Sequence, residues 1–91
     1  MQITRVALVG ILVENPDSIA QLNAILHEYS AYIIGRMGVP YPSKGVSIIS
    51  IAMDAPPDAI SALSGKLGML KGVSSKAVYG KMPSQSNARA D

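Results

Sequence analysis

The chain has 91 residues, of which 48% are hydrophobic and 15% are charged, and its formal net charge is +2. This length fits one domain, and so high an apolar fraction excludes a disordered chain. The chain has no Cys, Phe or Trp and its four Tyr are scattered. This composition excludes disulfides and thiolate metal sites and argues against the basic, aromatic-bearing face of a nucleic-acid-binding protein.

The first predicted element is a buried strand at 3–13, which is rich in Val, Ile and Leu and stops before Asn15 and Pro16. Its apolar run of about ten residues is half of what a membrane span needs and has no basic segment before it, so we expect no membrane contact and a cytoplasmic location. Asn15 can cap a helix and Pro16 suits the first turn. Apolar residues then recur at helical spacing, which predicts a helix at 16–30.

Residues 32–39 are predicted to form an edge strand, because Gly35 and Gly38 weaken the interior of a strand. A turn rich in Pro and Gly follows. After it, residues 46–53 have the composition of a second strongly apolar strand.

A second helix is predicted to start within 54–58, where two prolines precede an acidic residue. Its apolar stripe consists of Ile60, Leu63, Leu67 and Leu70. Residues 73–79 are the last predicted strand. The polar residues 82–91 are expected to form a disordered tail, which leaves a single folded domain at 1–81.

The element order βαββαβ with right-handed crossovers predicts an α+β fold, a ferredoxin-like sandwich. Its antiparallel sheet has the strand order 4-1-3-2, and both helices lie on one face. The residue pattern agrees with this order, because the two central strands are apolar on both sides. The edge strands carry polar side chains, namely Arg36, Ser74 and Lys76.

Two helices cover only one face of a four-stranded sheet, so the other face would expose apolar residues of the central strands. Soluble monomers seldom expose a large apolar patch. We therefore predict that the chain associates with copies of itself, most simply as a symmetric dimer. The sequence does not indicate which face carries the interface, and the candidate residues are Val6, Leu8, Leu12, Ile49 and Ile51.

No residue pattern in the chain predicts catalysis. His27 is the only histidine, and neither a set of metal ligands nor a nucleophile with its base surrounds it, so we expect no metal, no cofactor and no enzyme. An anionic ligand is expected at a subunit interface, near one of the helix N-termini around Asn15 or Pro56. Arg36 and Lys66 are the candidate cations, although such residues are more often solvated charges, and Gly38 completes the candidate ligand-binding set.

Two stretches resemble the iron-only hydrogenase system regulators: SAYIIGRMGVPY at 30–41, and ISALSGKLG at 60–68 followed by Gly72 and Val73. The similarity covers about residues 3–81. That family is similar to ACT domains and to the C-terminal domain of the nickel-responsive repressor, both ferredoxin-like and oligomeric. The resemblance implies a stand-alone regulatory domain linked to hydrogenase expression or maturation.

The ligand sites of those similar domains do not carry over to this chain. The nickel site uses several His and a Cys, and amino-acid-binding ACT domains commonly have a glycine in the loop after the first strand, whereas residues 13–17 contain none. No DNA-binding helical motif is present, so we do not expect direct binding to nucleic acid. Two interpretations remain open: a self-associating regulatory module that senses a small ligand or docks on a protein partner, and, as the alternative, a small enzyme on the same scaffold.

Overall fold

The computed structural model describes residues 3–81. Its elements are β1 (Arg5–Val13), α1 (Ile19–Glu28), β2 (Ile33–Tyr41), β3 (Val46–Ala55), α2 (Pro57–Gly68) and β4 (Val73–Tyr79). Three short 3-10 turns join them: η1 (Pro16–Ser18), η2 (Ser30–Tyr32) and η3 (Pro42–Lys44). The predicted tail, 82–91, lies outside the described residues. Within the described part, no helix is long and apolar enough to cross a membrane.

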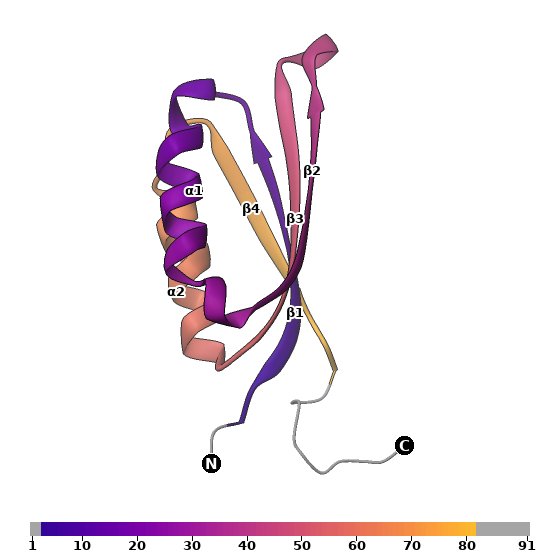
Figure 1. The fold of residues 1–91 in the computed structure, drawn as a ribbon, viewed down its shortest axis with the longest axis vertical. Coiled ribbons are helices and arrows are strands. Elements are labelled where there is room, and N and C mark those ends of the chain that lie inside the picture. Colours follow the sequence, from indigo (N-terminus) through magenta and orange to yellow (C-terminus); the bar gives the residue numbers. More distant parts are fainter. Residues whose placement is uncertain (1–2, 82–91) are drawn as a thin grey trace.

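The four strands form one antiparallel sheet in the order β2-β3-β1-β4. Both helices lie against the same face of this sheet (Figure 1). A small α+β fold with a four-stranded antiparallel sheet and two helices is therefore confirmed. The strand order is compatible with the predicted 4-1-3-2 read from the opposite edge, and β1 and β3 are the central strands, as expected.

The hydrophobic core lies between the helices and the inner face of the sheet. Alternate residues of the central strands point into it and are at most 8% exposed: Ala7, Val9, Ile11, Val13, Ile49, Ile51, Met53 and Ala55. The predicted helical stripes supply the other side, with Leu22, Leu26, Ile60, Leu63 and Leu67 buried. Each large side chain buried here contributes about 1.5–3 kcal/mol, so the core accounts for the inward orientation of both helices.

Several element boundaries differ from the sequence-based expectation. The first strand starts at Arg5 instead of Ile3, and the third ends at Ala55 instead of Met53. The predicted first helix, 16–30, is a 3-10 turn followed by an α-helix that starts at Ile19. The edge strand does not end at Val39, because its pairing with β3 continues to Tyr41 opposite Val46. Pro40 lies inside it, which an edge strand tolerates because one side of such a strand needs no hydrogen bonds.

The loop after β1 is fixed to the turn between α2 and β4. The Glu14 amide donates to the Gly72 carbonyl over 2.7 Å, and the Ser18 hydroxyl donates to the Lys71 carbonyl over 2.7 Å. Gly72 has a φ of 71°, and a Cβ on it would lie 2.7 Å from the Asn15 Cβ. Only glycine fits this close approach, so the two segments hold each other in place.

The β2–β3 hairpin is much less enclosed. Every residue of β2 after Ile33 is exposed, and Figure 1 shows the hairpin end leaning away from α1. The helix layer covers β1, β3 and β4 but leaves β2 largely open on the helix side. A hollow therefore separates α1 from β2.

Candidate functional site

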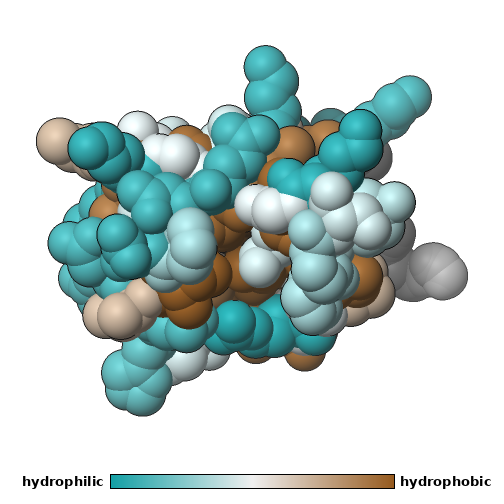
Figure 2. Space-filling model, turned by 90° about the horizontal axis from the view of Figure 1, so that it is seen from above, coloured by the Kyte–Doolittle hydropathy of each residue, from teal (hydrophilic) through white to brown (hydrophobic). Residues whose placement is uncertain are grey.

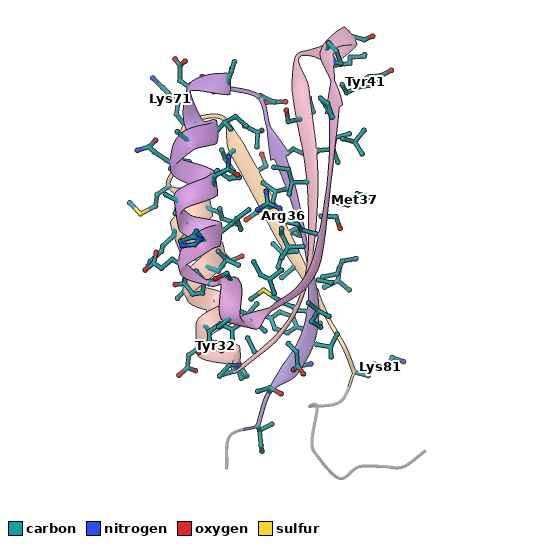
Figure 3. The ribbon with its side chains drawn as sticks, viewed as in Figure 1. Tyr32, Arg36, Met37, Tyr41, Lys71 and Lys81 are labelled. Atoms are coloured by element: carbon teal, nitrogen blue, oxygen red, sulfur yellow. The ribbon has the colours of Figure 1, made fainter. Side chains whose placement is uncertain are left out.

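Two surfaces stand out, and the first is the sheet face that the helices do not cover, called the open face below. Its large apolar side chains are between 39% and 65% exposed: Val6, Leu8, Leu12, Met37, Val39, Tyr41, Ile48 and Val78. Figure 3 shows Met37 and Arg36 on opposite sides of β2, with Met37 directed away from the helices. The open face is thus an apolar surface formed by all four strands.

Three rows of cross-strand neighbours form the centre of the open face. The first row carries three large side chains and consists of Val39, Ile48, Leu12 and Ser74. The middle row consists of Met37, Ser50, Gly10 and Lys76. The third row consists of Gly35, Ala52, Leu8 and Val78. A hollow of about 270 Å³ lies over the third row, with Val6, Leu8, Ala52 and Val78 in its lining.

The predicted interface residues divide between the two faces of the sheet. Val6, Leu8 and Leu12 lie on the open face, but Ile49 is 8% exposed and Ile51 is fully buried under the helices. Naming these two as interface residues was wrong, because their side chains cannot reach the open face. The antiparallel register pairs Leu12 with Ile48, so Ile48 and its alternate neighbours face outward instead.

Gly10 lies at the centre of the open face. A Cβ on this glycine would meet no atom within 4 Å. Packing within the described chain therefore does not require glycine at this position, although glycine weakens a central strand. The residue leaves room for something outside the chain to approach the sheet closely.

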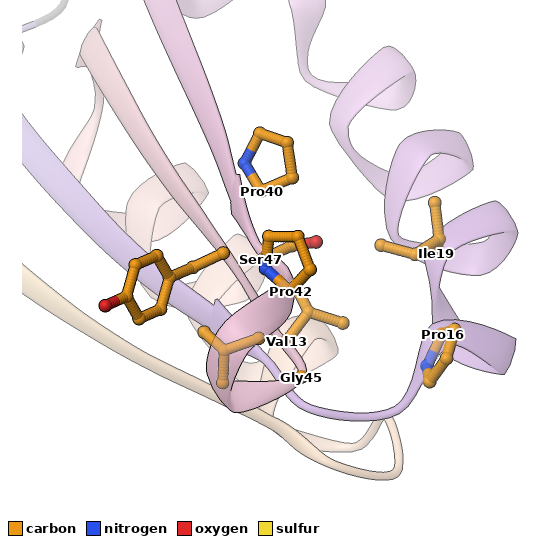
Figure 4. A pocket seen from close by; sticks show the side chains of 9 residues that line it. Val13, Pro16, Ile19, Pro40, Pro42, Gly45 and Ser47 are labelled. Carbon is orange, nitrogen blue, oxygen red and sulfur yellow. The ribbon is translucent and has the colours of Figure 1, made fainter.

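The second surface is a groove between α1 and β2, on the helix side of the sheet. Its first part has a volume of about 290 Å³ and is lined by Ile19, Asn23, Arg36, Gly38, Val39, Pro40, Ser47 and Ile49. The second part, of about 260 Å³, shares Ile19, Pro40 and Ser47 with the first and extends to Val13, Pro16 and the hairpin end (Figure 4). Figure 2 shows this end of the molecule, where hydrophobic atoms lie between two more hydrophilic layers.

Arg36 and Gly38, two of the four candidate ligand residues, come together in this groove. Both lie on the helix side of β2, because their partners across the strand pair are Ile51 and Ile49. The guanidinium of Arg36 is directed toward α1 (Figure 3) and donates to the Asn23 Oδ1 over a long 3.4 Å. The groove thus has one cation, and its hydrogen-bond partner is neutral.

The structure does not bring Asn15 and Lys66 to this site. The Asn15 side chain accepts a hydrogen bond from the Asp17 amide over 3.0 Å and so caps η1. Lys66 forms an ion pair with Glu28 over 2.9 Å and lies 5.2 Å from the centre of the Tyr29 ring. The hydrogen bond to Glu28 raises the pKa of Lys66 above its usual 10.5. Both residues therefore serve the fold.

The lining of the groove offers binding groups but little catalytic chemistry. No His, Asp or Glu is among the residues that line its two parts, so Ser47 has no base beside it. Among residues 3–81, no three His, Asp or Glu side chains gather in a way that could hold a metal ion. The sequence reasoning missed Asn23, Ser47 and Pro40, which only the register and the position of α1 bring together.

Comparison with known proteins identifies the family to which this chain is similar. The TM1266-like family model, described as "Iron-only hydrogenase system regulator, putative", matches residues 5–77. The solved structure of the uncharacterized protein TM1266 from Thermotoga maritima is 35% identical, with a TM-score of 0.83, and the similarity covers 86% of this chain and 99% of that one. None of the curated proteins matches this chain.

Proposed function

Because the chain belongs to the TM1266-like family, we propose that it is a regulatory module of an iron-only hydrogenase system and that it works as a dimer closed over its open face. The family match confirms the resemblance drawn from the sequence and includes both stretches that suggested it. We assign the fold to the ferredoxin-like class. The observation that carries the proposal is the apolar open face.

The size of this face fits a modest protein interface. Four strands at about 4.8 Å spacing and about seven residues at 3.3 Å each give a surface of roughly 19 by 23 Å. Each copy then contributes about 440 Å² and two copies roughly 900 Å² together, which lies below the range of stable specific interfaces, about 1,200 Å² and more, and is typical of a weak, reversible one. Eight large apolar side chains contribute to it. Contact between water and such an apolar patch is unfavourable, and a second copy that covers the patch removes this contact.

The arrangement of the rows supports a second copy as the occupant. We place a two-fold axis along the middle row, so that the first row of each copy faces the third row of the other. Large side chains then meet small ones, because Val39 faces Gly35 and Ile48 faces Ala52. Val78 likewise faces Ser74. Three of the four facing pairs thus match a large residue with a small one, as close packing of two aligned sheets requires, and in the fourth pair Leu12 faces Leu8.

The edges of the sheet favour face packing over edge pairing. β2 carries Pro40, which has no amide hydrogen to donate to a neighbouring strand, and β4 carries the charged Lys76. Both devices discourage strand addition at a sheet edge. Lys76 lies at the end of the middle row, where the proposed axis places it opposite the same residue of the second copy. The two long side chains must therefore extend to water beside the interface, away from each other.

The alternative, a small enzyme, has less support. The groove contains Arg36, Asn23, Ser47 and Tyr41 as its polar side chains, and no His, Asp or Glu lines it within the described part of the chain. General acid–base or nucleophilic catalysis needs such a base within hydrogen-bond distance. Binding is therefore the chemistry that these residues support best.

The proposal can be tested in a host that carries this gene and an iron-only hydrogenase. The chromosomal gene is deleted, or replaced by Leu8→Lys, which disrupts the open face, or by Met69→Lys. Met69 follows α2 and is 85% exposed, so it serves as the matched control. We expect deletion and Leu8→Lys to change hydrogenase transcripts or activity alike, and Met69→Lys to behave as wild type. A deletion without effect would refute the regulatory role.

A further inference from the structure

We propose that the groove between α1 and β2 binds a small molecule that carries one carboxylate on an apolar body. The bound molecule would be the ligand that the proposed regulatory module senses. Only the biological meaning of the site rests on that proposed function, because binding itself can be measured without it. The groove lies on the helix side of the sheet and the dimer surface on the other, so each can be tested without the other.

The charge of the groove selects an anion. Arg36 is the one charged side chain among the residues lining its two parts. Its guanidinium contacts only the neutral Asn23, over 3.4 Å, among the interactions found in residues 3–81, whereas the cation of Lys66 is already paired with Glu28. A guanidinium has five donors, so most of those of Arg36 are available to a ligand.

The number of cations favours a carboxylate over a phosphate. A planar guanidinium matches the two oxygens of a carboxylate in a bidentate pair, and one positive charge balances its single negative charge. A phosphate monoester carries nearly two charges at neutral pH, and the groove offers no second cation. The amide of Asn23 and the hydroxyl of Ser47 can orient further polar atoms.

The walls favour an apolar body. Ile19 and Ile49 line the first part of the groove, and Pro16, Pro40 and Pro42 line the second with Val13. Prolines have a fixed φ and no rotatable side chain, so this wall is rigid before a ligand arrives. A volume of about 290 Å³ lies at the lower limit of ligand pockets, which start near 300 Å³, so the ligand is small.

Gly38 supplies the space that such a ligand needs. It lies on the helix side of β2, and a Cβ on it would meet no atom within 4 Å. A side chain at this position would therefore project into the groove without touching the protein. Glycine in a strand often marks a close approach by a ligand or another backbone, and no described part of this chain makes that approach.

The test is a titration of isotope-labelled protein with hexanoate and with benzoate, followed by the amide shifts in NMR spectra. Hexanamide and benzamide serve as neutral controls of the same shape, and inorganic phosphate serves as the competing anion. We expect saturable shifts at Asn23, Arg36, Gly38 and Ser47 with the carboxylates, and none with the amides. Phosphate should bind more weakly than either carboxylate.

Three variants locate the binding. Arg36→Gln should weaken carboxylate binding about tenfold or more, as expected for the loss of a charge-assisted hydrogen bond. Gly38→Val should abolish it while the protein stays folded. Lys66→Gln removes a positive charge elsewhere and should leave the affinity unchanged.

Three results would overturn the proposal: no saturable shift with any carboxylate at tens of millimolar, equal binding by the amides, or an affinity that Arg36→Gln and Lys66→Gln change alike. Tighter binding of phosphate would refute the carboxylate class. None of these results depends on the dimer, because the mass of each variant in solution is measured separately. A monomeric wild type that still bound hexanoate would refute the proposed dimer and support the proposed binding site in the groove.

Discussion

Replacing Leu8 by Lys is predicted to dissociate the proposed dimer while leaving each chain folded. Leu8 lies on β1 in the third row of the open face and is 49% exposed in the single chain. About half of its side chain therefore remains to be buried by a partner. The other half contacts neighbours on its own sheet, and a lysine can keep those contacts through its aliphatic stem.

The magnitude follows from the exposed fraction. Complete burial of a leucine contributes about 1.5–3 kcal/mol, so the buried half contributes about 1 kcal/mol. A two-fold interface contains this residue twice, which gives about 2 kcal/mol for the pair. The two unpaired ammonium groups add a further penalty. We therefore expect the dissociation constant to rise by at least about 30-fold.

Sedimentation velocity over a concentration series measures this change. Met69→Lys introduces the same side chain on the helix side of the molecule and should dissociate as the wild type does. Circular dichroism and thermal unfolding check that both variants remain folded. The reasoning is refuted if folded Leu8→Lys dimerises as tightly as the wild type, or if Met69→Lys weakens the dimer equally.

Three further changes test other parts of the structure. Gly10→Val should prevent dimerisation and leave a folded monomer, because a Cβ at this position meets no atom within 4 Å; sedimentation measures the first and circular dichroism the second. Both Gly72 and Gly45 have positive φ, but only at Gly72 would a Cβ overlap a neighbour. Gly72→Ala should therefore lower the free energy of unfolding by about 1–3 kcal/mol more than the control Gly45→Ala does, as measured by urea titration. The ion pair with Glu28 raises the pKa of Lys66 above 10.5. Lys66→Gln should therefore have a lower free energy of unfolding than wild type at neutral pH, and this difference between the two proteins should vanish above the raised pKa. A difference that persists there would contradict the ion-pair explanation.

The fold was largely predictable because its signals are local. The helical stripe from Ile60 to Leu70 and the strongly apolar segment at 46–53 each specify one element, and the handedness of crossovers limits how they can be joined. The 3-10 turn at Pro16–Ser18 was missed because the same residues also suit the start of an α-helix.

The surfaces were less predictable because they depend on register and on helix position. The central strands are apolar on both sides, so the sequence could not tell Ile48, which is 39% exposed, from Ile49, which is 8% exposed. Which side faces the helices is decided by how β3 pairs with β1. The groove around Arg36 likewise exists because α1 does not reach over β2, and no local pattern encodes that distance.

The mass of the wild-type protein in solution tests the central claim most directly. One chain has a mass of 9.5 kDa. Sedimentation equilibrium at micromolar concentration should give twice this mass. The measured mass should fall to that of one chain on dilution, and Leu8→Lys should show the mass of one chain at the same micromolar concentration. A wild-type particle of 9.5 kDa at every concentration would mean that the open face stays in contact with water, which contradicts the account.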